Sequence, residues 1–227
     1  GHMKFLQNIP PYLFFTGKGG VGKTSISCAT AISLAEQGKR VLLVSTDPAS
    51  NVGQVFSQTI GNTILPVASV PGLSALEIDP QAAAQEYRAR IVDPIKGILP
   101  DDVVNSINEQ LSGACTTEIA AFDEFTGLLT DASLLTRFDH IIFDTAPTGH
   151  TIRLLQLPGA WSSFIESNPD GASCLGPMAG LEKQREQYSH AVQALSDPDR
   201  TRLVLVARLQ KSTLQEVART HDELAAI

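Results

Sequence analysis

A glycine-rich segment with a lysine and a hydroxyl residue at fixed positions is the part of this sequence best suited to chemistry. Residues 17–24 read Gly-Lys-Gly-Gly-Val-Gly-Lys-Thr, which matches the Walker A pattern of a phosphate-binding loop. Glycines let backbone N–H groups approach phosphate oxygens, and the following helix N-terminus adds partial positive charge. We expect Lys23 to contact the β- and γ-phosphates of ATP, and the Thr24 hydroxyl to ligate Mg²⁺. The predicted nucleotide-binding residues are Gly17, Lys18, Gly19, Gly20, Val21, Gly22, Lys23, Thr24 and Ser25.

Two aspartates that follow apolar runs complete the predicted site. Asp144 follows Ile141-Ile142-Phe143, which is the position of a Walker B carboxylate that holds Mg²⁺ directly or through water. Asp47 comes after the run 41–44, where it suits orienting or deprotonating the attacking water. An aspartate before a proline is also a common turn former, so a structural role for Asp47 is the alternative. The predicted catalytic residues are Asp47, Lys18 and Lys23, and the predicted magnesium residues are Thr24, Asp47 and Asp144.

The surrounding pattern predicts an α/β fold. The expected strands are Tyr12–Phe15, Val41–Val44, Ser74–Ile78, Ile141–Phe143 and Leu203–Ala207. Continuous apolar runs of this kind are typical of parallel strands that are covered on both faces. The stretch from Thr24 to Gln37 is expected to be a helix that ends at Gly38. We predict a P-loop NTPase with a mostly parallel sheet and helices on both faces.

A run of helices without strands interrupts this alternation. The ranges Gln81–Leu99, Pro100–Leu111 and Thr117–Leu135 all read as helices. We therefore expect one domain over residues 4–227 that carries a helical insertion at about 80–135. A second helix-rich stretch covers Gly180–Leu195, and Ser167–Gly176 reads as a loop because it is rich in Asn, Pro, Gly and Ser.

Composition limits the possible partners and compartment. The formal net charge is -7 and no lysine- or arginine-rich run occurs, so we expect no nucleic-acid partner. The longest apolar stretches are only a few residues, too short to cross a bilayer. Three widely spaced cysteines argue against a disulfide framework and favour reduced thiols in the cytoplasm.

Lys18, directly after the first glycine of the loop, makes the motif resemble the deviant Walker A of one branch of P-loop proteins. That branch includes the partitioning ATPases, the nitrogenase iron protein, the tail-anchored protein targeting ATPases and the arsenite ATPases. The resemblance implies that Lys18 contacts the phosphates of nucleotide held by a facing domain. A second cation there can neutralise charge during phosphoryl transfer, and a solvated surface lysine is the alternative.

Two further segments narrow the resemblance. Asp144–Thr151 is similar to the segment that links the nucleotide and cargo sites in arsenite ATPases and targeting ATPases, and Ser45–Asn51 fits the same pair. From about Phe5 to Ile227, including the stretches 111–118 and 154–161, the chain resembles the N-terminal half of the arsenite ATPases. The resemblance implies an ATPase in which binding of trivalent arsenic or antimony is coupled to ATP hydrolysis that drives an arsenite efflux pump.

The cysteines bear on the metalloid. Cys115 and Cys174 match two cysteines that the first half of arsenite ATPases contributes to a thiolate site, and soft thiolates suit a thiophilic metalloid. The resemblance implies Cys115 and Cys174 as ligands, with a third thiol elsewhere; spacing alone favours ordinary structural thiols. His150 suits a switch residue or weak extra ligand as well as a hydrogen-bonded structural histidine. Cys28, one turn after Thr24, is expected in the core.

The resemblance also implies partners. Full-length arsenite ATPases carry two homologous halves, and the chain stops at Ile227 inside a predicted helix, so we expect a fragment. Its implied partners are a second homologous half or another copy of itself, arsenite or antimonite, a membrane efflux pump subunit and a metallochaperone. It would lie in the cytoplasm, associated with the inner face of the cell membrane through the pump.

Two other functions are alternatives. A tail-anchored protein targeting ATPase needs a greasy, methionine-rich groove, but Met178 is the one methionine besides Met3. The closely spaced cysteine pair that zinc-mediated dimerisation would need is also missing from the sequence. The remaining alternative is a partitioning-type module in which ATP acts as a switch for assembly.

Overall fold

The computed structural model describes residues 7–17, 20–46, 52–145 and 185–206. The chain divides into two compact units. The first comprises residues 1–78, 132–146 and 197–227, and the second comprises residues 79–131 and 147–196. In the part of the chain that the structure describes, no helix is long and apolar enough to cross a membrane.

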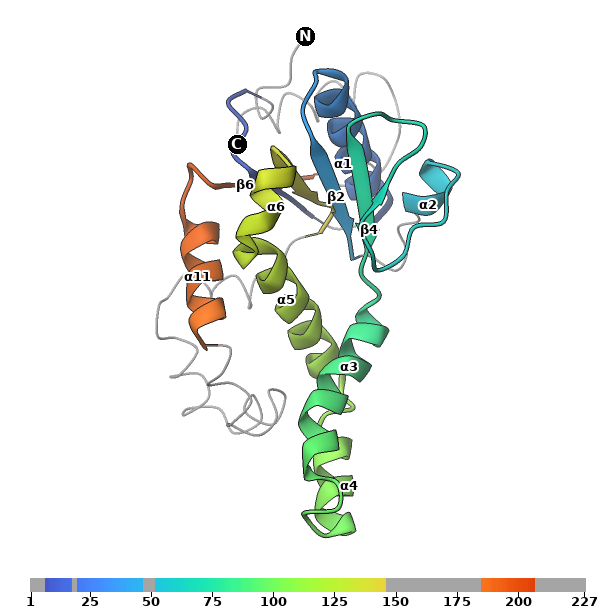
Figure 1. The fold of residues 1–227 in the computed structure, drawn as a ribbon, viewed down its shortest axis with the longest axis vertical. Coiled ribbons are helices and arrows are strands. Elements are labelled where there is room, and N and C mark those ends of the chain that lie inside the picture. The colour runs from blue at the N-terminus through green and yellow to red at the C-terminus, as the bar shows by residue number, and fades with distance from the viewer. Residues whose placement is uncertain (1–6, 18–19, 47–51, 146–184, 207–227) are drawn as a thin grey trace. The chain divides into compact units, whose positions relative to one another are not determined.

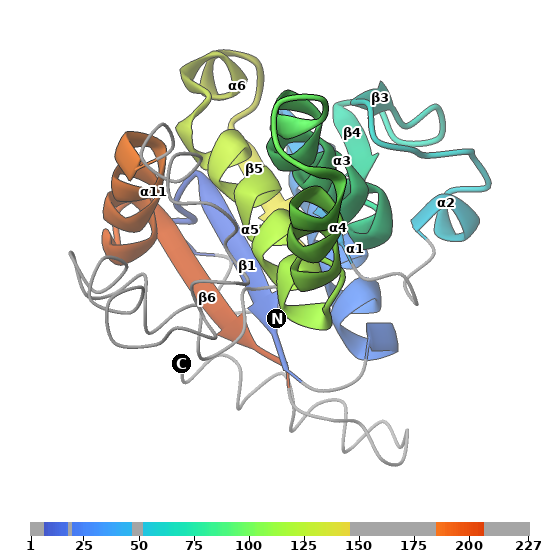
Figure 2. The same ribbon diagram turned by 90° about the horizontal axis from the view of Figure 1, so that it is seen from below.

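A six-stranded sheet with the order β3-β4-β2-β5-β1-β6 forms the first unit (Figures 1 and 2). The strands are β1 Tyr12–Thr16, β2 Val41–Ser45, β3 Leu65–Pro66, β4 Leu73–Glu77, β5 His140–Phe143 and β6 Thr201–Leu205. All neighbours pair in parallel except β3, which is antiparallel to β4. The predicted α/β fold with a mostly parallel sheet is confirmed.

Apolar runs explain why these strands lie at the centre of the unit. All residues of β2 and β5 are buried, as are the first four of β1. Leu13, Leu43 and Ile142 belong to one core cluster, whereas Phe14 and Phe143 stack with ring centroids 4.2 Å apart. Both sets are buried, so both faces of the central strands are covered, as the continuous apolar runs predict.

Strand β5 lies between β1 and β2 and pairs with both in parallel. Phe143 is in register with Phe14 of β1 and with Val44 of β2. The residues that follow these three strands therefore emerge at the same edge of the sheet. In open α/β sheets this carboxyl edge, where neighbouring connections diverge, is where ligands bind.

Helix α1, Gly20–Glu36, follows β1 and contacts β1, β2, β4 and β5. Its inner face buries small and aliphatic residues against the sheet, among them Cys28, Ala31 and Leu34. The helix begins four residues before the predicted start at Thr24, because the glycine-rich loop itself supplies the first turn. It ends as predicted: Gly38 has a φ of 85°, and its N–H donates to the Ala35 carbonyl at 3.0 Å.

The second unit is helical in its described part (Figure 1). It contains α3 Pro80–Val92, the 3₁₀ helix η2 Asp93–Ile95, α4 Asp101–Gln110, α5 Ala114–Thr130 and α11 Arg185–Ser196. Helix α5 packs against both α3 and α11. The Asp79 carboxylate caps α3 by accepting hydrogen bonds from the N–H groups of Gln81 and Ala82.

Helix boundaries in this region differ from the predicted ones. The helix expected over 81–99 ends at Val92, because Pro94 cannot continue it. The helix expected over 117–135 begins at Ala114 and ends at Thr130, where Asp131 is extended. A separate short helix, α6 Ala132–Arg137, follows and groups with the sheet unit. The short helix α2, Val52–Val55, lies outside every predicted element.

Candidate nucleotide-binding site

Gly17 and Gly22 of the predicted phosphate loop have different surroundings in the fold. Gly17 has a φ of 141°, and a Cβ atom there would collide with the backbone carbonyl of Val206. Val206 in turn donates its N–H to the Thr16 carbonyl at 2.7 Å, so it cannot move away without losing that bond. A Cβ at Gly22 would meet only the Val206 side chain, at an ordinary 3.8 Å. The fold therefore demands glycine at position 17, whereas at position 22 it leaves room for a Cβ atom.

Thr24 is a buried hydroxyl residue near the start of α1. It lies in the first turns of this helix and is 6% exposed, and its Oγ1 is buried without a hydrogen-bond partner among the described residues. Leaving a buried polar group unsatisfied costs about 1–3 kcal/mol. A cation ligated by this oxygen would remove that cost, so Thr24 fits the role of a Mg²⁺ ligand. Lys23 precedes it on the same turn and is partly buried.

Asp144, directly after β5, is fully buried at 0% exposure. Its Oδ2 accepts a 2.5 Å hydrogen bond from the Ser45 hydroxyl, and its Oδ1 accepts one from the Thr46 N–H at 3.1 Å. A hard carboxylate at the carboxyl edge of the sheet is the kind of group that Mg²⁺ prefers. The donor set of Thr24 and Asp144 therefore fits this cation.

Cys28 lies on the same helix as Thr24 and is influenced by the charge of Asp144. It is buried one turn after Thr24 on α1, as the sequence predicts, and these two positions share one helix face. Burial raises the pKa of its thiol to about 12, and the nearby Asp144 carboxylate adds to this effect.

Three residues that were not predicted as site residues, Ser45, Thr46 and Thr145, form hydrogen bonds at the carboxyl edge of the sheet. The hydroxyls of Thr46 and Thr145 form a hydrogen bond that joins the ends of β2 and β5, in addition to the contact of Ser45 with Asp144. The available signal was their adjacency to the two aspartates, in Ser45-Thr46-Asp47 and Asp144-Thr145. That signal becomes specific only when β2 and β5 are known to be neighbours.

Several predicted site residues lie outside the described part of the chain. These are Lys18, Gly19, Asp47, His150 and Cys174. Cys115 falls in the first turn of α5, but its side chain is not described. Among the residues that are described, no three His, Cys, Asp or Glu side chains come together as a metal site. The structure places Gly17 and Asp144 after neighbouring strands at the carboxyl edge of the sheet and Thr24 in the first turns of α1, and the predicted metalloid ligands stay a prediction.

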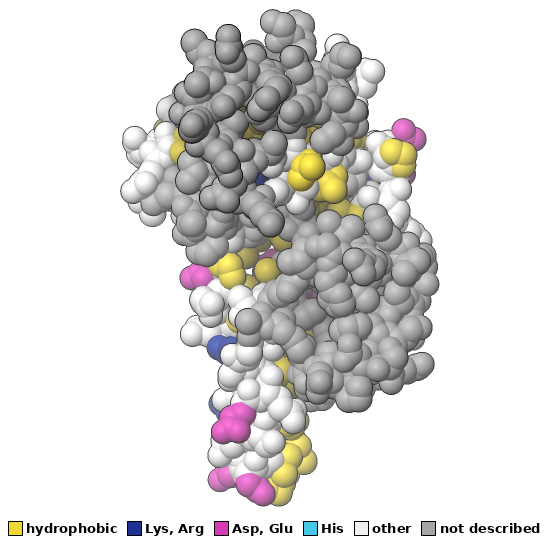
Figure 3. Space-filling view, turned by 180° about the vertical axis from the view of Figure 1, so that it is seen from behind, with side chains coloured by type: hydrophobic (Ala, Val, Ile, Leu, Met, Phe, Trp, Pro, Cys, Tyr) yellow, Lys and Arg dark blue, Asp and Glu magenta, His cyan; other side chains and the backbone are white. Residues whose placement is uncertain are grey.

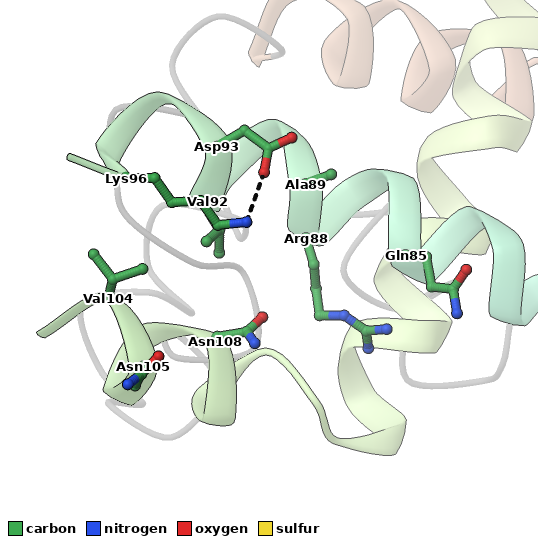
Figure 4. A pocket seen from close by; sticks show the side chains of 9 residues that line it. All are labelled: Gln85, Arg88, Ala89, Val92, Asp93, Lys96, Val104, Asn105 and Asn108. Carbon is green, nitrogen blue, oxygen red and sulfur yellow. Dashed lines mark ion pairs between the residues drawn. The ribbon is translucent and has the colours of Figure 1, made fainter. Parts of the chain in front are cut away.

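The helical unit holds a separate pocket of about 360 Å³ between α3 and α4. Figure 4 shows Arg88 of α3 pointing toward α4, and the ion pair of Asp93 with Lys96 (3.4 Å) at the other end of the pocket. The lining residues are Gln85, Arg88, Ala89, Val92, Asp93, Lys96, Val104, Asn105 and Asn108. None of the predicted site residues is among them.

The turn that leads into α4 exposes apolar side chains beside acidic ones. Ile98 is 78% exposed, and Leu99 and Val103 are exposed as well. Asp101 and Asp102 form the first turn of α4 at the same place. Figure 3 shows hydrophobic and acidic side chains next to each other at this end of the helical unit.

A glycine-rich loop between a parallel strand and a helix, with a buried aspartate after a nearby strand, defines a P-loop NTPase. The sequence model of the family described as anion-transporting ATPase matches residues 11–227. The chain belongs to this family, as the resemblance to the arsenite ATPases predicts.

Individual relatives are named more specifically. The chain is 93% identical over 225 residues to an arsenical pump-driving ATPase of Escherichia coli, covering 99% of this chain and 39% of that protein. It is 92% identical to an arsenical pump-driving ATPase of Acidiphilium multivorum over the same length and coverage. A protein of Halobacterium salinarum is 42% identical over 216 residues, or 95% of this chain and 33% of that protein. The chain therefore spans between about a third and two fifths of the length of these curated relatives.

Proposed function

We propose that this chain is the N-terminal nucleotide-binding part of an arsenical pump-driving ATPase. In this proposal it hydrolyses ATP in response to trivalent arsenic or antimony and thereby drives an arsenite efflux pump. The structural observation that carries the nucleotide site is the buried Thr24 hydroxyl in the first turns of α1, which has no hydrogen-bond partner among the described residues. The family match and the names of the relatives support the ATPase and the pump.

The proposed chemistry is positioning and charge stabilisation around the phosphates of ATP. Backbone N–H groups of residues 17–25 surround the phosphates, and Lys23 contacts the β- and γ-phosphates. Thr24 and Asp144 hold Mg²⁺, which when bound neutralises charge that develops in phosphoryl transfer. Asp47 orients the attacking water, and Lys18 reaches the phosphates of nucleotide in a facing domain.

Metalloid binding is proposed at Cys115 and Cys174, with a third thiol from a partner and His150 as a switch or extra ligand. In this scheme the helical insertion at about 80–135 belongs to the metalloid site, and Asp144–Thr151 transmits binding to the nucleotide site. Cys28 is not a candidate ligand, because metal ligation needs a thiolate and burial raises its pKa to about 12. In this proposal Cys28 is structural, whereas Cys115 and Cys174 are functional.

The proposed partners follow from the same scheme. The facing domain is a second homologous half or a second copy of this chain. A membrane efflux pump subunit receives the metalloid, a metallochaperone delivers it, and the protein associates with the inner face of the membrane through the pump.

A nucleotide titration tests the ATP site. Lys23→Ala is expected to abolish binding of a fluorescent ATP analogue, whereas Lys39→Ala is expected to bind like the wild type because Lys39 follows the far end of α1. Retained affinity in Lys23→Ala would show that the phosphate loop is misassigned.

Hydrolysis in the full-length protein tests the metalloid site. Antimonite should stimulate ATP hydrolysis, and the double change Cys115→Ser with Cys174→Ser should remove the stimulation but keep basal hydrolysis. Cys28→Ala is the matched control and should keep the stimulation. If the double variant is stimulated like the wild type, the two thiols are structural.

A further inference from the structure

The end of β2 engages the Asp144 residue at three points. The Asp144 N–H donates to the Val44 carbonyl at 3.0 Å. The Ser45 hydroxyl donates to Oδ2 at 2.5 Å, and the Thr46 N–H donates to Oδ1 at 3.1 Å. Two of these contacts come from the backbone and persist whatever side chain β2 carries, whereas the contact with Oδ2 depends on the Ser45 hydroxyl.

Burial makes that hydroxyl contact important. Ser45 and Asp144 are both almost completely inaccessible to water, so solvent cannot replace a lost donor. Hydrogen bonds from a hydroxyl to a carboxylate are short and about twice as strong as those between neutral groups. Oδ1 accepts from the Thr46 N–H and Oδ2 from the Ser45 hydroxyl, so the Ser45 contact helps to hold the rotation of the carboxylate about its Cβ–Cγ bond.

Ser45 also lies close in the sequence to another predicted site residue. Ser45 is the last residue of β2 and lies two residues before Asp47. The same short segment therefore holds the Asp144 carboxylate and leads into Asp47, the predicted catalytic aspartate.

We propose that Ser45 is a positioning residue for the magnesium site, resting on the function proposed above. Its hydroxyl fixes Oδ2 of Asp144 so that the carboxylate presents itself to a cation held together with the Thr24 hydroxyl. Hydrogen bonds that orient the ligands of a metal change metal affinity by about 10–100-fold when they are removed. Ser45 is therefore expected to act on cation binding and not on the contact of the loop with phosphate.

Manganese binding measured by electron paramagnetic resonance is the test, because Mn²⁺ substitutes for Mg²⁺ and gives a readout independent of turnover. The full-length protein is titrated with Mn²⁺ in the presence of adenylyl-imidodiphosphate. Ser45→Ala is expected to weaken Mn²⁺ binding about 10-fold, while the affinity for the nucleotide without metal stays at the wild-type value. Ser45→Thr, which keeps a hydroxyl, should restore Mn²⁺ affinity.

Two further variants separate positioning from general damage to the core. Ser45→Cys keeps the size of the side chain but supplies a much weaker donor, so it should fold and still bind Mn²⁺ more weakly than the wild type. Thr30→Val removes a buried hydroxyl that donates to the Ile26 carbonyl and should leave Mn²⁺ affinity unchanged.

Each outcome bears on a different claim. Wild-type Mn²⁺ affinity in folded Ser45→Ala or Ser45→Cys would overturn the positioning role. An equal loss of metal-free nucleotide affinity would overturn it too, because it would mean that the loop as a whole is disturbed. If the wild-type protein binds no Mn²⁺ together with the nucleotide, the proposed function itself fails.

Discussion

Cys28 lies close enough to Asp144 for the carboxylate to raise the pKa of its thiol, beyond the larger increase that burial causes. The two residues belong to α1 and to the end of β5, which contact each other in the sheet unit. The negative charge of Asp144 therefore lies near α1, the helix that begins within the phosphate loop. With its pKa raised to about 12, the buried thiol is almost entirely protonated at neutral pH.

Cys28 is therefore expected to resist alkylation in the native protein. With a pKa of about 12 the thiolate fraction at pH 8 is on the order of 10⁻⁴, and the thiolate is the reactive species. Iodoacetamide labelling at pH 8 followed by peptide mass spectrometry should find Cys28 unmodified. The same protein labelled in denaturant is the control and should be fully modified at this position. Rapid labelling of Cys28 in native protein would contradict the burial of this thiol.

Thr24→Val should have opposite effects on the free protein and on the loaded one. Valine keeps the shape of threonine but removes a hydroxyl that is buried without a partner, so the free energy of unfolding should rise by about 1 kcal/mol. The stabilisation by Mg²⁺ with ATP should largely disappear, because the proposed ligand is gone. Urea unfolding with and without Mg²⁺ and nucleotide measures both effects.

Thr30→Val provides the matched comparison. Thr30 lies on the same helix and is buried, but its hydroxyl donates to the Ile26 carbonyl at 2.7 Å. Its removal should lower the free energy of unfolding by about 1 kcal/mol and leave the effect of Mg²⁺ with nucleotide intact. If both variants lose the same stability, the Thr24 hydroxyl has a partner in the free protein.

Gly17 and Gly22 of the loop should respond differently to alanine. Gly17→Ala should destabilise the sheet unit by about 2 kcal/mol or more, because the new methyl collides with the Val206 carbonyl and the backbone φ of 141° suits only glycine. Gly22→Ala should leave the unfolding midpoint nearly unchanged and weaken nucleotide binding. Thermal unfolding and a nucleotide titration of both variants check this contrast. A stable Gly17→Ala variant would mean that Val206 is placed differently.

Local pattern was enough to predict the central strands of the fold but not their order. The runs at Tyr12, Val41 and Ile141 are continuous and apolar, and each became a buried strand. Nothing in a single sequence says that β5 lies between β1 and β2, because that pairing joins segments about a hundred residues apart. Strand β3, only Leu65–Pro66 and exposed, and the four-residue α2 are too short to produce a periodic signal.

The same limit applies to the site. Gly17, Thr24 and Asp144 could be predicted because they belong to recognisable sequence motifs that lie next to strand ends. The contact of Ser45 with Asp144 could not be predicted, since it depends on the pairing of β2 with β5. A serine at the end of a strand is by itself an ordinary residue.

The helical unit contains an ion pair whose loss should be costly. Arg90 of α3 donates to Asp123 of α5 at 2.9 Å, and the carboxylate side is only 7% exposed. Arg90→Ala leaves that carboxylate buried without its cation, so we expect a loss of about 1–3 kcal/mol in unfolding free energy. Lys96→Ala breaks the exposed pair with Asp93 and should cost about 0.5 kcal/mol. Urea unfolding of the two variants measures the difference, and equal losses would indicate that Asp123 is solvated.

Protonation of His140 is expected to lower the stability of the protein in mild acid. Burial lowers the pKa of its imidazole below 6.5, although its hydrogen bond with the Pro10 carbonyl opposes this effect. The unfolded chain therefore binds a proton more readily than the folded one. The contribution of His140 to stability is complete above the unfolded pKa and is lost as the pH falls through the folded pKa. Urea midpoints measured from pH 7.5 to pH 5 should decrease for this reason.

His140→Gln isolates that contribution from other groups that titrate nearby. Asp139 has a pKa lowered to about 2 by Arg40, so its effect on stability is lost only in stronger acid. Glu124 has a pKa raised by burial, and it adds stability as the pH falls, which opposes the effect of histidine. Glu124 is unaffected by His140→Gln, and Asp139 loses only the smallest of the contributions that lower its pKa. The variant should therefore lose less stability than the wild type between pH 7.5 and pH 5. Parallel curves for the two proteins would mean that His140 has the same pKa in the folded and unfolded states.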